Sequence, residues 1–218
     1  MKSLDHVALW VADRDSIAEF ATAHLGMHVI ERTDRFTLVG SDARRGKLTL
    51  FAADGPREQG ALEHVGLRVS DLEAARAALP DGTPEVFEIG EGFFVTLVEA
   101  ETDVDYDLDH VALRSPDPEA AARSYAGYGF APAGSSRVEV GGAYVELHPG
   151  DPGEPERPLL NHLAVLVDSA EEYRRWAEEN GVEVDDVVDA PNTYAVFLVG
   201  PDGVRIEYVE HKPSFSLT

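Results

Sequence analysis

Histidine recurs in this 218-residue chain within four closely similar phrases. The phrases read LDHVALWV, LEHVGLRV, LDHVALRS and LNHLAVLV, and they carry His6, His64, His110 and His162. A neutral imidazole is a common ligand of divalent metals and also moves protons near neutral pH. The chain has no cysteine, so any bound metal must be held by imidazole and carboxylate groups rather than by thiolates.

Each phrase alternates as a strand does. The leucine, the histidine and the following alanine or glycine share one face, and the valines and leucines between them share the other. A segment with helix-start residues and helical periodicity follows each phrase. Short β-branched and aromatic pieces then follow, such as MHVIER, FTLVG and KLTLFAA in the first repeat. The pattern predicts four modules, each with one strand, one helix and about three further strands.

One such module is too small to bury its own sheet face, so two modules must share a core. The acidic segment at residues 101–107 predicts a boundary between an N-terminal domain, 1–104, and a C-terminal domain, 105–218. A second loop, at residues 149–158, joins the third module to the fourth. Pairing of the first module with the fourth, and of the second with the third, stays open as an alternative.

The chain is strongly acidic. Lys and Arg number 18 against 41 for Asp and Glu, which gives a formal charge of −23. Such a surface repels a phosphate backbone, so nucleic acid is excluded as an expected partner. The sequence has neither a basic-then-apolar signal at its start nor an apolar run of membrane-spanning length. We therefore expect a cytoplasmic protein that contacts no membrane.

The LDHVAL phrase with its following helix, and the closing segment GPDGVRIEYVE, resemble the vicinal-oxygen-chelate superfamily. This superfamily includes glyoxalase I, bleomycin-resistance proteins and extradiol dioxygenases, and the resemblance covers essentially the whole chain. It implies an α+β fold in which four βαβββ modules pair into two open-barrel domains. Four modules in one chain are most similar to the two-domain extradiol dioxygenases, although a fused four-module glyoxalase is also similar. These motifs specify the fold better than the reaction.

The resemblance also implies that metal ligands lie on the first and last strands of the modules. The first-strand positions are the four histidines. The last-strand positions are Glu146 in YVEL and Glu207 in RIEY, whereas KLTLF and FVTLV supply threonine or leucine, around Thr49 to Leu50 and Thr96 to Leu97. Sequential pairing of the modules would gather both carboxylates in one site, and we prefer it for that reason.

The resulting expectation is one divalent metal in the C-terminal domain, held by His110, His162 and Glu207. Glu146 is either a fourth ligand or a partner of a ligand. Two imidazoles and one carboxylate leave positions open for a bidentate substrate. Without a carboxylate of their own, the two histidines of the N-terminal half are interpreted as structural, and the N-terminal site as lost.

The first functional hypothesis is an extradiol-type dioxygenase that uses Fe(II) or Mn(II) on a small catechol-like substrate. The sequence departs from that family at two places. Phe197 stands where the resemblance puts a tyrosine, and Val188 stands where it puts a histidine. Tyr194, His148 and Asp189 are the candidates to replace them in proton transfer.

The alternative is a glyoxalase-like isomerase or lyase with Ni(II) or Zn(II), in which Glu146 moves a proton. A third hypothesis is a protein that binds a metabolite or drug without catalysis. The closing segment KPSFSLT could cover the site or contact a second subunit of a homo-oligomer, and composition does not choose between them.

Overall fold

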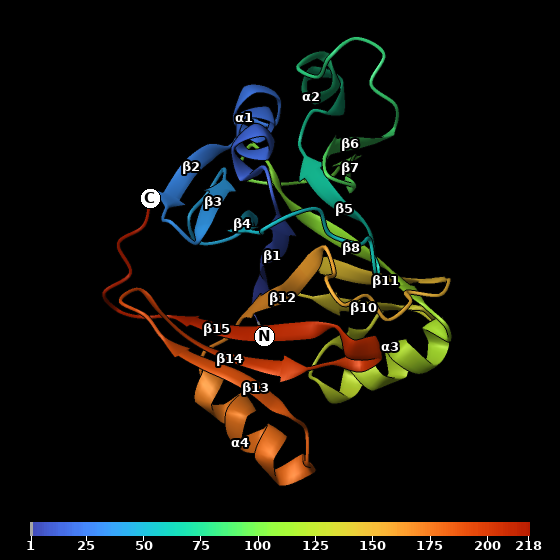
Figure 1. Ribbon diagram of the computed structural model, residues 1–218, viewed down its shortest axis with the longest axis vertical. Helices are drawn as coiled ribbons and strands as arrows, with labels where there is room; N and C mark the ends of the chain where they lie inside the picture. Colours follow the sequence, from blue (N-terminus) through green and yellow to red (C-terminus); the bar gives the residue numbers. More distant parts are fainter. Residues whose placement is uncertain (1) are drawn as a thin grey trace.

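The computed structural model describes residues 2–218 and contains four successive modules along the chain (Figure 1). The first module comprises β1 (Ser3–Val11), α1 (Arg14–His24), β2 (His28–Arg32), β3 (Phe36–Gly40) and β4 (Lys47–Ala52). The second comprises β5 (Leu62–Val69), α2 (Leu72–Ala77), β6 (Val86–Gly90) and β7 (Phe93–Glu99). The third comprises β8 (Asp107–Ser115), α3 (Pro118–Gly127), β9 (Ala131–Pro132), β10 (Arg137–Val140) and β11 (Ala143–Pro149). The fourth comprises β12 (Leu160–Leu166), α4 (Ala170–Asn180), β13 (Val184–Asp189), β14 (Thr193–Val199), the 3-10 turn η1 (Pro201–Gly203) and β15 (Arg205–His211).

The modules form two mixed sheets, and the expected α+β class with repeated modules is confirmed. One sheet has the order β13-β14-β15-β12-β1-β4-β3-β2, and the other has the order β6-β7-β5-β8-β11-β10-β9. In each sheet the first strands of two modules lie side by side and antiparallel at the centre. Each first strand also pairs in parallel with the last strand of its own module.

The preferred sequential pairing of modules is wrong. The first module shares its sheet with the fourth, and the second shares its sheet with the third. β5 pairs with β7 along one edge. The short segment 100–106 then leads from β7 to β8, which pairs with the other edge of β5. The boundary expected near residue 104 therefore divides the chain between modules, and both sheets contain strands from each side of it.

The second module is shorter than expected. Within residues 2–218, α2 is followed by β6 and β7, whereas each of the other helices is followed by three strands of its module. The segment after α2 reads PDGTPE and contains Pro80 and Pro84. Proline lacks a backbone N–H and cannot complete a strand ladder, which explains the missing strand.

Helices cover one face of each sheet because their apolar sides need a partner. Asp13, Asp71, Asp117 and Ser169 cap α1, α2, α3 and α4 by accepting hydrogen bonds from backbone N–H groups. α1 packs on β3, and α4 packs on β14 and β15. Among the described residues, none of the helices combines the length and apolar character needed to cross a bilayer. The sheet face opposite the helices is left for His6, His162 and their neighbours.

Candidate metal centre

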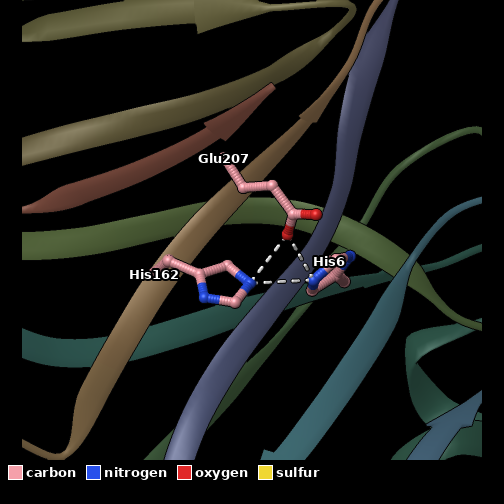
Figure 2. A group of neighbouring side chains, drawn as sticks. All are labelled: His6, His162 and Glu207. Carbon is pink, nitrogen blue, oxygen red and sulfur yellow. Dashed lines mark hydrogen bonds and ion pairs between the residues drawn. The ribbon is translucent and has the colours of Figure 1, made fainter. Parts of the chain in front are cut away.

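Three potential ligands meet on neighbouring strands of the first sheet. His6 lies on β1, His162 on β12 and Glu207 on β15, and their side chains point at one another (Figure 2). The Nε2 atoms of the two histidines are 3.0 Å apart. The Oε2 atom of Glu207 lies 3.1 Å from Nε2 of His6 and 2.8 Å from Nε2 of His162. All three side chains are largely buried, so the cluster is a compact group of donor atoms inside the protein.

A neighbouring residue orients each imidazole. Nδ1 of His6 lies 2.8 Å from Oδ1 of Asp5, and Nδ1 of His162 lies 2.9 Å from Oδ1 of Asn161. Both oxygens accept hydrogen bonds, so each Nδ1 donates and each neutral imidazole keeps a free lone pair on Nε2. The Nε2 lone pairs of both neutral imidazoles and Oε2 of Glu207 would then face one another with no hydrogen atom between them. A proton or a metal ion must lie there to offset the repulsion.

The separations fit one face of an octahedron. Ligand bonds of about 2.1 Å at right angles put neighbouring donor atoms about 3.0 Å apart, whereas tetrahedral angles would put them about 3.4 Å apart. The three observed separations run from 2.8 to 3.1 Å. Two imidazoles and one carboxylate in this arrangement can hold a divalent metal and leave the opposite face open.

The fourth equivalent position in this sheet holds a threonine. Glu207 on β15 pairs with Ala164, which lies two residues after His162. In the first module, the residue two positions after His6 is Ala8, and its partner on β4 is Thr49. Thr49 is therefore the counterpart of Glu207. Thr49 is buried and lines the same cavity as the cluster. This cluster therefore contains one carboxylate rather than the two that a His-Glu-His-Glu set would need.

The charges in the cluster are strongly coupled. Burial opposes the charge on His6, but Glu207 and Asp5 outweigh it and raise the pKa of the imidazole to about 9. Burial also opposes the charge on Glu207, yet His6 and His162 lower the pKa of that carboxyl to about 2. Burial lowers the pKa of His162 despite the nearby Glu207. The metal-free cluster thus holds one proton, on His6, against the Glu207 carboxylate.

We expect the metal-free protein to lose stability as the pH rises from about 6.5 to about 9. A folded-state pKa raised to about 9 contributes stability that is complete below the unfolded pKa of 6.5 and is lost as the pH passes through 9. The expected loss in free energy of unfolding is about 2 to 4 kcal/mol. Urea unfolding in the presence of a chelator, near pH 6 and near pH 9, measures it. The expectation fails if a His6→Gln variant shows the same pH dependence as the wild type.

The Asp5 carboxylate that contacts His6 also forms a buried ion pair with Lys47. Oδ2 of Asp5 lies 2.9 Å from Nζ of Lys47 and 3.2 Å from Nε2 of His211. Burial raises the pKa of Asp5, but Lys47, His211 and His6 together hold it well below its usual range. The imidazole of His6 is consequently fixed by a carboxylate that three groups keep ionised.

The cluster opens into a cavity of about 460 Å³, a volume in the range usual for small-molecule sites. Aromatic side chains from β1, β3, β4, β14 and the C-terminal tail form much of its wall, namely Trp10, Phe36, Phe51, Phe197 and Phe215. The ring of Phe197 meets the ring of His162 edge-on with centroids 5.1 Å apart. The cavity therefore suits a flat apolar molecule that reaches the cluster with polar groups.

The C-terminal tail forms part of this wall. Phe215 stacks on His211 with ring centroids 4.2 Å apart, and Leu217 also lines the cavity. The backbone oxygen of Thr218 lies 3.4 Å from Nε2 of His28 on β2. The tail thus runs from β15 toward β2. The sequence left open whether this segment covers the site or contacts a second subunit, and in the structure it lies beside the site.

The expected grouping of His110 with His162 and Glu207 is not formed. His110 lies on β8 in the other sheet, with its Nε2 atom 3.1 Å from Nε2 of His64. Glu146 lies on β11 in that same sheet, where Arg137 contacts it. His6, which the sequence analysis interpreted as structural, takes the place expected for His110. The cause is the pairing of the first module with the fourth.

The candidates for proton transfer also lie away from the cluster. His148 is on β11 in the other sheet, paired with Glu63 at 2.7 Å. The hydroxyl of Tyr194 donates to Glu171 on α4, on the helix-covered side of the sheet. Asp189 pairs with Lys212 at the end of β13. Lys47, His211 and Asn161, which the sequence analysis did not select, line the cavity instead.

The family can be assigned directly. The chain belongs to the glyoxalase/bleomycin resistance protein/dioxygenase superfamily, whose sequence model matches residues 3–104 and 107–208. Members of this superfamily are mostly metal-dependent enzymes that bind small molecules at the metal. The His-His-Glu cluster is consistent with that general property.

Solved structures agree with the fold. A presumed dioxygenase from Bacillus subtilis is similar with a TM-score of 0.81 and 17% identity, over 98% of this chain and 87% of that one. Glyoxalase I from Zea mays is similar with a TM-score of 0.69 and 15% identity, over 96% and 92% of the two chains. The cppA protein from Streptococcus pneumoniae is similar with a TM-score of 0.63 and 13% identity, over 94% of this chain and 96% of that one. Comparison with curated proteins gave no match. These identities establish shared architecture alone.

Proposed function

We propose that this protein is an extradiol-type ring-cleaving dioxygenase that acts on a small catechol-like molecule and uses Fe(II) or Mn(II). The observation that carries the proposal is the set of His6, His162 and Glu207, whose donor atoms lie 2.8 to 3.1 Å apart and match one face of an octahedron. Thr49 in place of a second carboxylate leaves the remaining face free for substrate.

When bound, such a metal supplies redox chemistry between a chelated catecholate and dioxygen. The protein's own groups prepare the site. Asp5 and Asn161 hold the two imidazoles with Nε2 facing the centre, and Lys47 keeps Asp5 ionised. Fixed ligands of this kind reduce the reorganisation needed when substrate binds.

The cavity walls favour an aromatic substrate over a small polar one. Trp10 and Phe51 contact each other at 5.3 Å between ring centroids on one side of His162, and Phe197 lies on the other side. Aromatic rings pack well against a flat ring and exclude water from it. Phe197 cannot exchange a proton, so in this chain proton transfer falls to His211 or Lys47, the titratable cavity groups next to Asp5.

The glyoxalase-like alternative has less support. It depended on Glu146 as a second carboxylate beside the metal, and Glu146 lies in the other sheet. The position where a second carboxylate would stand in this cluster is Thr49. Cytoplasmic location and self-association stay predictions from the sequence.

The proposal is tested with protein purified without an affinity tag, freed of metal and reloaded anaerobically with Fe(II). A panel of catechols is then added with dissolved oxygen recorded and products identified by mass. The expected result is uptake of one O₂ per substrate and a product that contains both oxygen atoms. Nickel- or zinc-dependent isomerisation of a hydroxy-carbonyl adduct, without oxygen uptake, would contradict the proposal.

We expect Thr49→Glu to retain metal while lowering oxygen uptake by about tenfold or more. The new carboxylate would stand opposite Ala8, as Glu207 stands opposite Ala164, and would occupy a position that the substrate needs. The matched control is Thr49→Val, which removes the hydroxyl without adding a ligand and should keep most of the uptake. Equal rates for the glutamate variant and the wild type would show that Thr49 does not mark an open ligand position.

A further inference from the structure

The amide of Asn161 differs chemically from the carboxylate that orients His6. The phrase around His6 reads LDHVALWV, whereas the phrase around His162 reads LNHLAVLV. Oδ1 of Asn161 lies 2.9 Å from Nδ1 of His162, as Oδ1 of Asp5 lies 2.8 Å from Nδ1 of His6. An ionised aspartate can only accept a hydrogen bond, whereas an asparagine can present either its oxygen or its NH₂ group. Asparagine by itself therefore leaves the position of the His162 proton undecided.

That position matters for the metal centre. With the Asn161 oxygen facing the ring, Nδ1 of His162 carries the proton and Nε2 keeps a lone pair toward His6 and Glu207. If the amide turned over, its NH₂ group would donate to Nδ1, and the proton would lie on Nε2. A protonated Nε2 cannot bind a metal ion. The orientation of one amide thus decides whether His162 is ready to act as a ligand.

Arg205 contacts the Asn161 oxygen. Nη1 of Arg205 lies 3.4 Å from Oδ1 of Asn161. A guanidinium group has donors only, so it favours the amide oxygen at this place over the NH₂ group. Lys47 contacts Asp5 in a similar way, but there the cation balances a carboxylate. Asn161 has no charge to balance, so what Arg205 contributes to it is orientation.

Two further contacts fix the guanidinium group of Arg205. Its Nε and Nη2 atoms each lie 2.5 Å from Oδ2 of Asp185 on β13. Its Cζ atom lies 4.1 Å from the centroid of the Phe197 ring, which in turn meets the ring of His162 edge-on. Because Asp185 engages Nε and Nη2, Nη1 is the nitrogen left to contact Asn161.

Packing alone does not hold the amide in place. Asn161 is half-buried. Asn161 and Arg205 line both the cavity at the cluster and a second cavity of about 990 Å³, which is also lined by residues 151–155 and η1. Open space on two sides leaves the amide room to turn, so a specific contact is needed to fix it.

We propose that Arg205 is a positioning residue for the metal centre, which holds the Asn161 oxygen toward His162 and thereby keeps Nε2 of His162 free of a proton. The inference rests on the role of His162 as a metal ligand in the proposed function, but not on the dioxygenase reaction. The Arg205 side chain is 28% exposed, so its replacement is expected to leave the fold intact.

The first test reads the tautomer directly, in metal-free protein with nitrogen-15-labelled histidine. At about pH 8 His162 is neutral, because burial lowers the pKa of that imidazole. Nitrogen-15 NMR distinguishes protonation on Nδ1 from protonation on Nε2, and His162→Gln assigns the signals. Wild type should carry the proton on Nδ1, and Arg205→Met should give a mixture of the two forms. An Arg205→Met protein that stays wholly protonated on Nδ1 would overturn the proposal.

The second test measures Mn²⁺ binding at high ionic strength, with the free ion quantified by electron paramagnetic resonance. Arg205→Met should weaken binding by about fivefold or more, because it removes support from a partner of a metal ligand. Loss of a nearby positive charge would by itself strengthen the binding of a cation. A weaker affinity therefore separates the effect of orientation from the effect of charge.

Asn161→Asp provides a rescue, because a carboxylate accepts a hydrogen bond in either orientation. In the Asn161→Asp background, Arg205→Met should no longer weaken Mn²⁺ binding. Equal weakening in both backgrounds would show that Arg205 only supports the fold. Arg174→Met is the matched control, since Arg174 forms its ion pairs on α4, and it should change neither the tautomer nor the affinity. A wild type that binds no Mn²⁺ would contradict the proposed function, while the tautomer would still decide whether Arg205 sets the His162 proton.

Discussion

His6→Ala should lower the affinity of the cluster of His6, His162 and Glu207 for Fe(II) or Mn(II) by about hundredfold or more, while His110→Ala should leave that affinity unchanged. His6 supplies one of three donor atoms that lie within 3.1 Å of one another, and an alanine leaves only His162 and Glu207. His110 lies in the other sheet beside His64. Removal of a metal ligand should cost at least the 10- to 100-fold that loss of a ligand's supporting partner costs.

The measurement is metal retained after gel filtration against a competing chelator, with less than one equivalent of metal added. The two variants form a matched pair, because both remove a largely buried histidine from the centre of a sheet. Loss of metal in His110→Ala with retention in His6→Ala would support the grouping expected from the sequence and contradict the sheet pairing in the structure.

Asp5→Asn should destabilise the metal-free protein by about 3 to 5 kcal/mol, because it leaves the ammonium group of Lys47 buried without a counter-charge. The side chain of Lys47 is 4% exposed, and its charged partner is Asp5 at 2.9 Å. Lys47 keeps a hydrogen bond to the backbone oxygen of Ala43, which does not neutralise its charge. Chemical unfolding in the presence of a chelator, near pH 7, measures the change.

The double variant Asp5→Asn with Lys47→Met separates loss of the ion pair from loss of packing. It should recover about 2 kcal/mol relative to Asp5→Asn alone, because the uncompensated charge is gone. Asp189→Asn is the control, since Asp189 is 73% exposed in its pair with Lys212 and its replacement should cost at most about 1 kcal/mol. A double variant less stable than Asp5→Asn would show that Lys47 stabilises the fold by other means.

Much of the local structure could be predicted from the sequence. The phrase around His162 alternates as a strand, and RIEY places Glu207 on the inner face of a last strand, where the structure has it. The segments MHVIER, FTLVG and KLTLFAA, predicted as strands in the first module, correspond to β2, β3 and β4. Side-chain alternation is a local property, and it is readable without knowledge of the partner strand.

The partner of each first strand could not be predicted in the same way. LDHVALWV and LDHVALRS present nearly the same faces, so either can lie beside LNHLAVLV with its histidine in register. Whether His6 or His110 joins His162 depends on which edges are free after each module has folded. That is a property of topology, and the preference for gathering Glu146 and Glu207 in one site was a chemical assumption rather than a structural one.

Lys47, by contrast, could have been identified. In KLTLFA the side chains of Lys47, Thr49 and Phe51 share one face, and the position of Thr49 was already expected to match a ligand position on the inner face of the sheet. A lysine on an inward face needs a buried anion, and Asp5 beside His6 was the available carboxylate. The position of His211 beside the cavity was harder to predict from the sequence, because His211 packs against Phe215 of the C-terminal tail.

The most direct test is anomalous X-ray diffraction from crystals of the protein loaded with less than one equivalent of Mn(II). The account predicts one dominant peak about 2.1 Å from Nε2 of His6, Nε2 of His162 and Oε2 of Glu207. The absence of a peak at that position, or a dominant peak between His64 and His110, would contradict it.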